Sequence, residues 1–158
     1  MAFDFEKKIT DGELLLLTDR SNSRCIIRTD SGVVYAFVED DNPGTVRRWL
    51  AKSVDDGVNW TFPVQVPWWN SGTARSARIA YNSAAGANTV HLALSLEFSE
   101  NPSHVTELVY RQVVSDVLGG YEYPFDLTGA INYHDAPRIV IDSSGDVYLA
   151  AIDRKSVV

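Results

Sequence analysis

Three arginines, Arg24, Arg78 and Arg138, stand at similar places along the chain and could take part in ligand binding. Each is followed by a short run rich in β-branched residues, and their separations are 54 (78 − 24) and 60 (138 − 78) residues. A guanidinium group presents a planar fork of N–H donors, which matches the geometry of a carboxylate. The arginines are therefore candidates for binding a carboxylate or a sugar.

The segments that lead into these arginines carry further side chains of the same chemical kind. Tryptophan and tyrosine present flat apolar faces to a sugar ring, and histidine and aspartate exchange hydrogen bonds with hydroxyl groups. We predict a ligand site in these loops and assign no catalytic residue. The further candidates are Trp68, Trp69, Arg75, Tyr133, His134 and Asp135, and Asp19, Arg20 and Asn70 lie in the same loops.

Each candidate also has a structural alternative. Trp68 and Trp69 could pack between layers of the fold, and His134-Asp135 could be an ordinary surface pair. The arginines could hydrogen-bond loop carbonyls or pair with an acid such as Asp142. The sequence leaves both sets of roles open.

Several other chemistries lack support. The histidines and the single cysteine, Cys25, do not stand at the spacing of a zinc site, and Asp40-Asp41 and Asp55-Asp56 lack the pattern of a twelve-residue calcium loop. No phosphate-binding loop, dinucleotide fingerprint or nucleophile elbow occurs. We therefore predict no metal and no cofactor, and we interpret Cys25 as a core residue, because it stands in an apolar run.

Charge and hydropathy narrow the class of partner. The 158 residues carry a formal net charge of −7, which argues against a general nucleic-acid binder. No run approaches the length of a transmembrane helix, and the N-terminus lacks the order of a signal peptide, so we predict no membrane insertion and assign no localisation. A single cysteine excludes an intrachain disulfide.

The elements around the arginines form an internal repeat. Residues 23–37, 77–94 and 137–150 each contain an arginine, a β-rich run, a turn of small and polar residues, and a second β-rich run. Further strands are predicted near 45–53, 60–66, 104–114 and 121–127, and no long window has helical periodicity. The pattern predicts an all-β protein with four antiparallel strands per repeat.

One turn motif is more specific. Ser53-Val-Asp55-Asp-Gly57-Val-Asn-Trp60 fits the Asp-box pattern, in which a short acid and a serine bond the turn, glycine relaxes the backbone and tryptophan packs beside the next strand. Here the chain resembles the sialidase-like β-propeller family, whose Asp-box repeats lie in structural turns. We interpret Ser53, Asp55, Gly57 and Trp60 as fold markers. The corresponding segment 115–121 is a degenerate match.

The resemblance implies one module over 1–158, with blade 1 at 20–66, blade 2 at 67–127 and the first half of blade 3 at 128–158. Because about three blades cannot close a ring, we expect a homo-oligomer, with six blades in a dimer. Residues 3–18 have the pattern of a strand–turn–strand hairpin within an N-terminal segment of residues 1–19. We expect this hairpin to complete blade 3 of another protomer. A truncated chain is the alternative.

The resemblance also bears on function. Sialidases of this fold bind a substrate carboxylate with three arginines, and Arg24, Arg78 and Arg138 keep the arginine of the family's Arg-Ile-Pro motif but lose the proline. No Tyr–Glu nucleophile pair is identified. We expect a non-catalytic carbohydrate-binding or structural module, whose partners are other copies of itself and a glycan. A sialidase-like glycoside hydrolase is the alternative.

Overall fold

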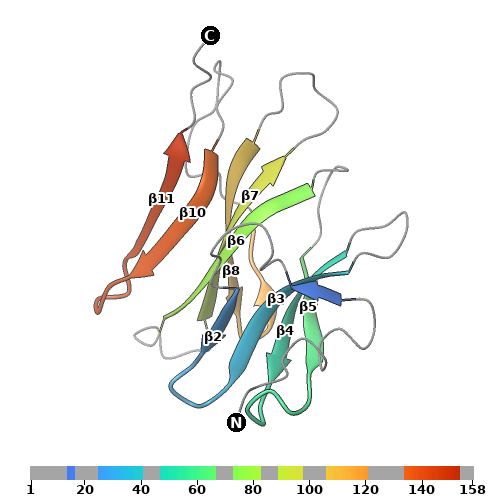
Figure 1. Cartoon of the computed structure of the whole chain (residues 1–158). Coiled ribbons are helices and arrows are strands. Elements are labelled where there is room, and N and C mark those ends of the chain that lie inside the picture. The colour runs from blue at the N-terminus through green and yellow to red at the C-terminus, as the bar shows by residue number, and fades with distance from the viewer. Residues whose placement is uncertain are drawn as a thin grey trace.

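The fold consists of antiparallel β-sheets, as seen in a computed structural model that describes residues 14–16, 25–40, 47–66, 73–82, 89–97, 106–120 and 134–153. These residues form three sheets and no helix, which confirms the predicted all-β class (Figure 1). Each sheet uses one continuous stretch of the chain, so the order of the sheets follows the order of the sequence.

The first sheet has five strands in four positions. Its order is β2 (Ile26–Arg28), β3 (Val34–Asp40), β4 (Arg47–Ser53) and β5 (Thr61–Gln65), and β1 (Leu14–Leu16) lies beyond β2 along the same edge of β3. The register of β4 and β5 shifts by one residue between Leu50 and Lys52. Pro63 lies opposite this irregularity, where its missing N–H does least harm to the ladder.

The second and third sheets follow the same plan. The second contains β6 (Thr73–Asn82), β7 (Thr89–Glu97), β8 (Thr106–Val114) and the short β9 (Val117–Leu118) in sequence order. The third contains β10 (His134–Ile141) and β11 (Val147–Asp153). The central strand β7 is largely apolar, and Val90, Leu92, Ala93 and Leu94 on its two faces are all buried.

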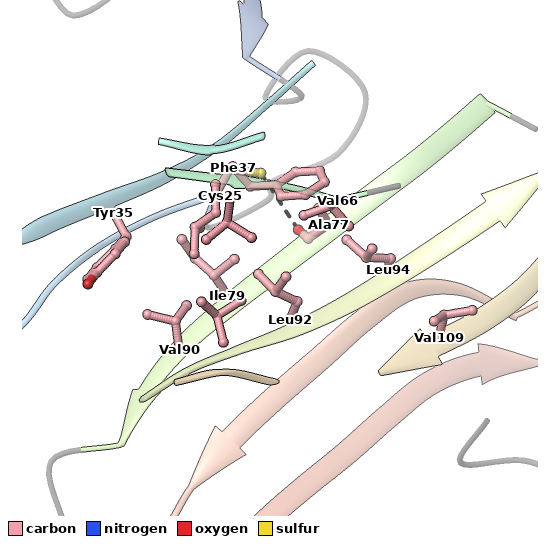
Figure 2. Close-up of a cluster of buried hydrophobic side chains, with 13 residues drawn as sticks. Cys25, Tyr35, Phe37, Val66, Ala77, Ile79, Val90, Leu92, Leu94 and Val109 are labelled. Atoms are coloured by element: carbon pink, nitrogen blue, oxygen red, sulfur yellow. Dashed lines mark hydrogen bonds between the residues drawn. The ribbon is translucent and has the colours of Figure 1, made fainter. Parts of the chain in front are cut away.

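The main core lies between the first and second sheets. Phe37 of the first sheet packs with Leu92 and Leu94 of the second (Figure 2). Leu50 of the first sheet belongs to the same cluster, and none of the four is exposed. Cys25 belongs to the same cluster, with its Sγ 3.7 Å from the carbonyl oxygen of Ala77. The interpretation of Cys25 as a buried core residue is confirmed.

The three sheets stack in the same sense. Side chains alternate across a strand, so the first sheet turns Cys25 and Tyr35 toward the second, whereas the second turns Ile79 and Leu92 back toward the first. The opposite face of the second sheet contains Arg78, and β10 crosses that side, in contact with β6, β7 and β8. Each sheet therefore covers the sheet before it.

The first and third sheets share one hairpin turn. In the turn at 29–33, the backbone N–H of Val33 donates to Thr29 Oγ1 at 3.0 Å, and in the turn at 142–146 the N–H of Asp146 donates to Asp142 Oδ1 at 3.0 Å. In both, the fourth residue is a glycine with positive φ (86° and 92°), which closes a three-residue loop.

This equivalence corrects the alignment of the repeats by one residue. Counting back from the two turns, the pairs Ile26–Ala36 and Ile139–Leu149 coincide. Arg138 therefore occupies the position of Cys25, not that of Arg24. The repeated arginines misled the alignment because the first repeat has one more residue between its arginine and its turn.

The strands predicted at 45–53, 60–66 and 104–114 correspond to β4, β5 and β8. The strand predicted at 121–127 lies outside the described residues, and a two-residue turn at Ser115-Asp116 leads directly into β9. Leu14–Leu16, expected to complete the third sheet of another protomer, instead lies against Val38–Asp40 of its own chain. The rest of that predicted hairpin lies outside the described residues.

Candidate functional site

The first strands of the second and third sheets begin with matching irregularities. The register of β6 against β7 shifts by one residue between Ala74 and Ser76, and that of β10 against β11 shifts between Asp135 and Arg138. An extra residue in one strand forms a β-bulge, which twists the strand and changes where side chains point. Arg75 lies at the first bulge, and His134-Asp135 begins the second strand, so three predicted site residues occur at equivalent strand entries.

The described arginines of the predicted site donate hydrogen bonds to the backbone. Arg78 donates from Nη1 to the carbonyl oxygen of Ala77 at 3.3 Å, and Arg138 donates from Nη1 to that of Pro137 at 3.2 Å. Arg78 is 5 % exposed beneath β10, whereas Arg138 is exposed on the outer face of the third sheet. Bonding to a carbonyl is the structural role considered above, and it is the same in both arginines.

The other candidates are only partly located. Arg24, Trp68, Trp69 and Tyr133 lie outside the described residues, so their predicted role stays a prediction. His134 pairs with Asp153 and Asp135 with Ile152 in the ladder of β10 and β11. The structure therefore places Arg75 at the start of β6, and His134 and Asp135 at the corresponding start of β10. Arg78 follows Arg75 by three residues, Arg138 follows Asp135 by three residues, and both lie on sheet faces.

The turn between β4 and β5 is closed by the residues of the predicted motif. Ser53 Oγ donates to Asp55 Oδ1 at 2.8 Å and accepts the N–H of Gly57 at 2.8 Å. Asp55 accepts the backbone N–H of Asn59, and this bond lowers the pKa of the Asp55 carboxyl. The indole N–H of Trp60 donates to the carbonyl oxygen of Gly57 at 3.0 Å. All of these bonds lie within the turn, as expected of a structural role.

A polar cluster that the sequence reasoning missed joins the first two sheets. Asp116, in the β8–β9 turn, accepts a hydrogen bond from Lys52 Nζ at 2.6 Å and one from the Tyr35 hydroxyl at 3.4 Å. The hydrogen bond to Asp116 raises the pKa of Lys52, and burial raises the pKa of Tyr35. Asp116 has a φ of 64°, which aspartate tolerates better than most residues. The cluster links the first and second sheets. Its aspartate comes from segment 115–121, which we interpreted as a degenerate match to the Asp box.

A second missed group lies on the face of the second sheet that β10 crosses. His91 Nδ1 lies 2.6 Å from the hydroxyl of Tyr110, which also accepts a hydrogen bond from Gln112 Nε2 at 2.9 Å. Because Gln112 donates to the hydroxyl oxygen, the hydroxyl proton is free to go to Nδ1, and a His91 that accepts it carries its own proton on Nε2. Burial lowers the pKa of His91, and its Nε2 has no hydrogen-bond partner among the described residues.

The alternation of side chains along β7 and β8 is the feature of the sequence that could have indicated the group of His91, Tyr110 and Gln112. Opposite residues in an antiparallel pair share a face, and the register sets His91 opposite Gln112. The register of β7 against β8 is not given by the sequence alone, so the contact of His91 with Tyr110 was not predicted. Within the described ranges, no group of three His, Cys, Asp or Glu side chains could hold a metal ion.

The described part of the chain contains no helix that is long and apolar enough to span a membrane. No protein-family model matches the chain, and no match was found among curated proteins or solved structures. The fold itself defines an all-β protein of antiparallel sheets stacked in one sense, with the irregular strand entries of the second and third sheets at corresponding positions.

Proposed function

We propose that this chain is a non-catalytic module of the sialidase-like β-propeller type, which binds carbohydrate at the entries of its first strands and assembles with copies of itself. The observation that carries the proposal is the matched bulge at the start of β6 and β10, next to Arg75 and His134-Asp135. Bulges are common beside binding sites because they redirect side chains. The stacking of the sheets in sequence order supports the propeller architecture.

The residue types at these entries favour a sugar with hydroxyl and carboxylate groups. Arg75 supplies a cation with a planar fork of donors, and His134 and Asp135 supply groups that exchange hydrogen bonds with hydroxyls. Trp68, Trp69 and Tyr133 precede the same strands in the sequence and offer apolar faces. A purely structural module is the outcome if no sugar binds.

Assembly follows from the number of sheets. The third sheet has two described strands and the others fill four positions, so we propose that two chains together form a closed ring of six sheets. Ring closure would bring the strand entries of both chains to one end of a common axis. The site would then be shared between the protomers.

The test is binding to an array of neutral and sialylated oligosaccharides, combined with hydrolysis of a fluorogenic sialoside. We expect array binding without turnover, and at least a tenfold loss of binding in Arg75→Ala and in His134→Ala. Arg28→Ala is the matched control, because Arg28 lies at the far end of β2 and pairs with Asp56 at 2.8 Å on the surface. Turnover of the sialoside that falls in Arg75→Ala would replace the proposal with the hydrolase alternative.

A further inference from the structure

The outer face of the third sheet has the composition of an interface, but no described residue covers it. Val140 is 62 % exposed and Tyr148 is 58 % exposed, and both lie on this face with Arg138 and Ala150. We call these four residues the open face. Large apolar side chains that are exposed side by side on a regular sheet indicate a surface that another protein covers.

The equivalent positions in the first sheet are buried, except that Ile27 is partly buried. By the shared hairpin turn, Cys25, Ile27, Tyr35 and Phe37 correspond to Arg138, Val140, Tyr148 and Ala150. Tyr35 and Phe37 are buried against the second sheet, which packs on them with Ile79 and Leu92. The open face therefore occupies the position that, in the first two sheets, is covered by the next sheet.

The covering surface also has a repeated composition. Ile79 pairs with Leu92 in the second sheet, and Ile139 pairs with Leu149 in the third, and both pairs face the preceding sheet. The corresponding pair in the first sheet is Ile26 and Ala36. Ala36 is 0 % exposed in a cluster against which Trp49 and Trp60 pack, whereas Ile26 is 37 % exposed, and no preceding sheet packs on this face within the described residues.

Aromatic side chains lie on the same face as Ile26, on β4 and β5, which are separated from β2 by β3. Trp49 and Phe62 form an edge-to-face pair with ring centroids 6.2 Å apart, and Phe62 is 37 % exposed. Trp49 packs on the fully buried Val38 and Ala51 of the same face. An apolar surface with a partly exposed aromatic pair is suited to cover a small apolar face such as that of Val140 and Ala150.

We propose that the open face of one chain binds the Ile26–Trp49–Phe62 surface of a second copy, in the same head-to-tail manner in which the second sheet covers the first. The proposal rests on the homo-oligomer of the proposed function and assigns its contact. Because the two surfaces differ, each chain offers one of each, and two copies can close with two identical contacts around a two-fold axis.

The test is the mass in solution, by light scattering after size exclusion, of the full chain and of Val140→Asp and Ile26→Asp. We expect two chains for the unchanged protein and one chain for each variant, since either substitution places a charge in both contacts. Val117→Asp is the control, because Val117 is 69 % exposed on β9, away from both surfaces. Circular dichroism of each variant shows whether the sheets are still folded, and Tyr148→Ala offers a milder change at the open face.

Mixing the two single variants tests the head-to-tail geometry. A mixed pair contains one contact with both substitutions and one contact with none, so mixing Val140→Asp with Ile26→Asp should restore a two-chain species. A contact between two open faces would leave Ile26→Asp as a two-chain species on its own, and that outcome would overturn the proposal. If the unchanged protein contains two chains and neither substitution dissociates them, this contact is wrong but the homo-oligomer is not. If the unchanged protein is a monomer, both the contact and the homo-oligomer are wrong. Carbohydrate binding is then still tested separately by the oligosaccharide array.

Discussion

Tyr35 and Tyr148 occupy the same position in two equivalent hairpins, yet Tyr35 is 1 % exposed and Tyr148 is 58 % exposed. The Tyr35 hydroxyl reaches Asp116 on the following sheet, whereas the Tyr148 hydroxyl donates to Asp142 within its own hairpin at 3.2 Å. A tyrosine at this position is therefore compatible with the hairpin itself, and it becomes buried only where a following sheet packs on it.

The first prediction concerns this pair. Replacing Tyr35 by alanine should lower the free energy of unfolding by about 3–5 kcal/mol, because it leaves a cavity between two sheets. Replacing Tyr148 by alanine should lower it by less than about 0.5 kcal/mol in the single chain, because an exposed side chain has few contacts to lose. Urea denaturation of both variants at low protein concentration measures the difference, and equal losses would contradict it.

The turn between β4 and β5 depends on a buried hydroxyl. Ser53 is 1 % exposed, and its replacement by alanine leaves the N–H of Gly57 without its acceptor. We expect a loss of about 1–3 kcal/mol in the free energy of unfolding, the cost of a buried unsatisfied group. Val54→Ala serves as the control in the same denaturation experiment, because Val54 is 75 % exposed; a loss in Val54→Ala as large as that in Ser53→Ala would count against this reading.

The ion pair of Lys52 and Asp116 should stabilise the fold at neutral pH and should lose this effect at alkaline pH. Because the pKa of Lys52 is raised by folding, this stability is fully present below the unfolded pKa of lysine, about 10.4, and is lost as pH rises through the folded pKa. At pH 7 we expect Asp116→Asn to cost about 0.5–1 kcal/mol, since the pair is partly exposed.

A pH series of denaturation curves measures this effect for Asp116→Asn. Asp56→Asn is the matched control, because Asp56 forms its surface ion pair with an arginine, Arg28, rather than with a lysine. The cost of Asp116→Asn should shrink above about pH 10.4, while that of Asp56→Asn should stay small and constant. A constant cost for both would show that the charge of Lys52 does not matter.

His91 should make the protein less stable at mildly acidic pH. Its pKa is lowered by burial, so the unfolded chain takes up a proton near pH 6.5 that the folded chain does not. Stability is then complete above that pH and falls as pH decreases toward the folded pKa. Between pH 7.5 and pH 5, His91→Gln should lose less stability than the unchanged chain, and identical pH profiles would contradict the neutral, buried state.

The sequence supported the strand content because β-branched runs and turn residues are local signals. The turn at 142–146 illustrates this, since Asp142 and Gly145 stand in the spacing that a three-residue loop needs. Ser53 and Asp55 were also placed correctly in a turn between two strands.

The features that the sequence did not predict depend on contacts between residues that are far apart in the sequence. Arg24, Arg78 and Arg138 suggested a register by their identity, but the backbone bonds of the hairpin place Cys25 opposite Phe37 and thus at the position of Arg138. Asp116 reaches Lys52 across 64 residues of sequence, and nothing local to either residue announces that contact. For the same reason the sequence could not place Leu14–Leu16 beside β3.

The confinement of each sheet to one stretch of chain has a consequence for how the protein forms. Every described strand pairing except that of β1 with β3 joins strands that are consecutive in the sequence, so most native contacts close short loops, and short loops cost little conformational entropy. The first sheet can be complete while the ribosome is still adding the second, and each later sheet finds a finished surface on which to settle. The order of synthesis is thereby also an order of assembly, from Leu14 toward Asp153.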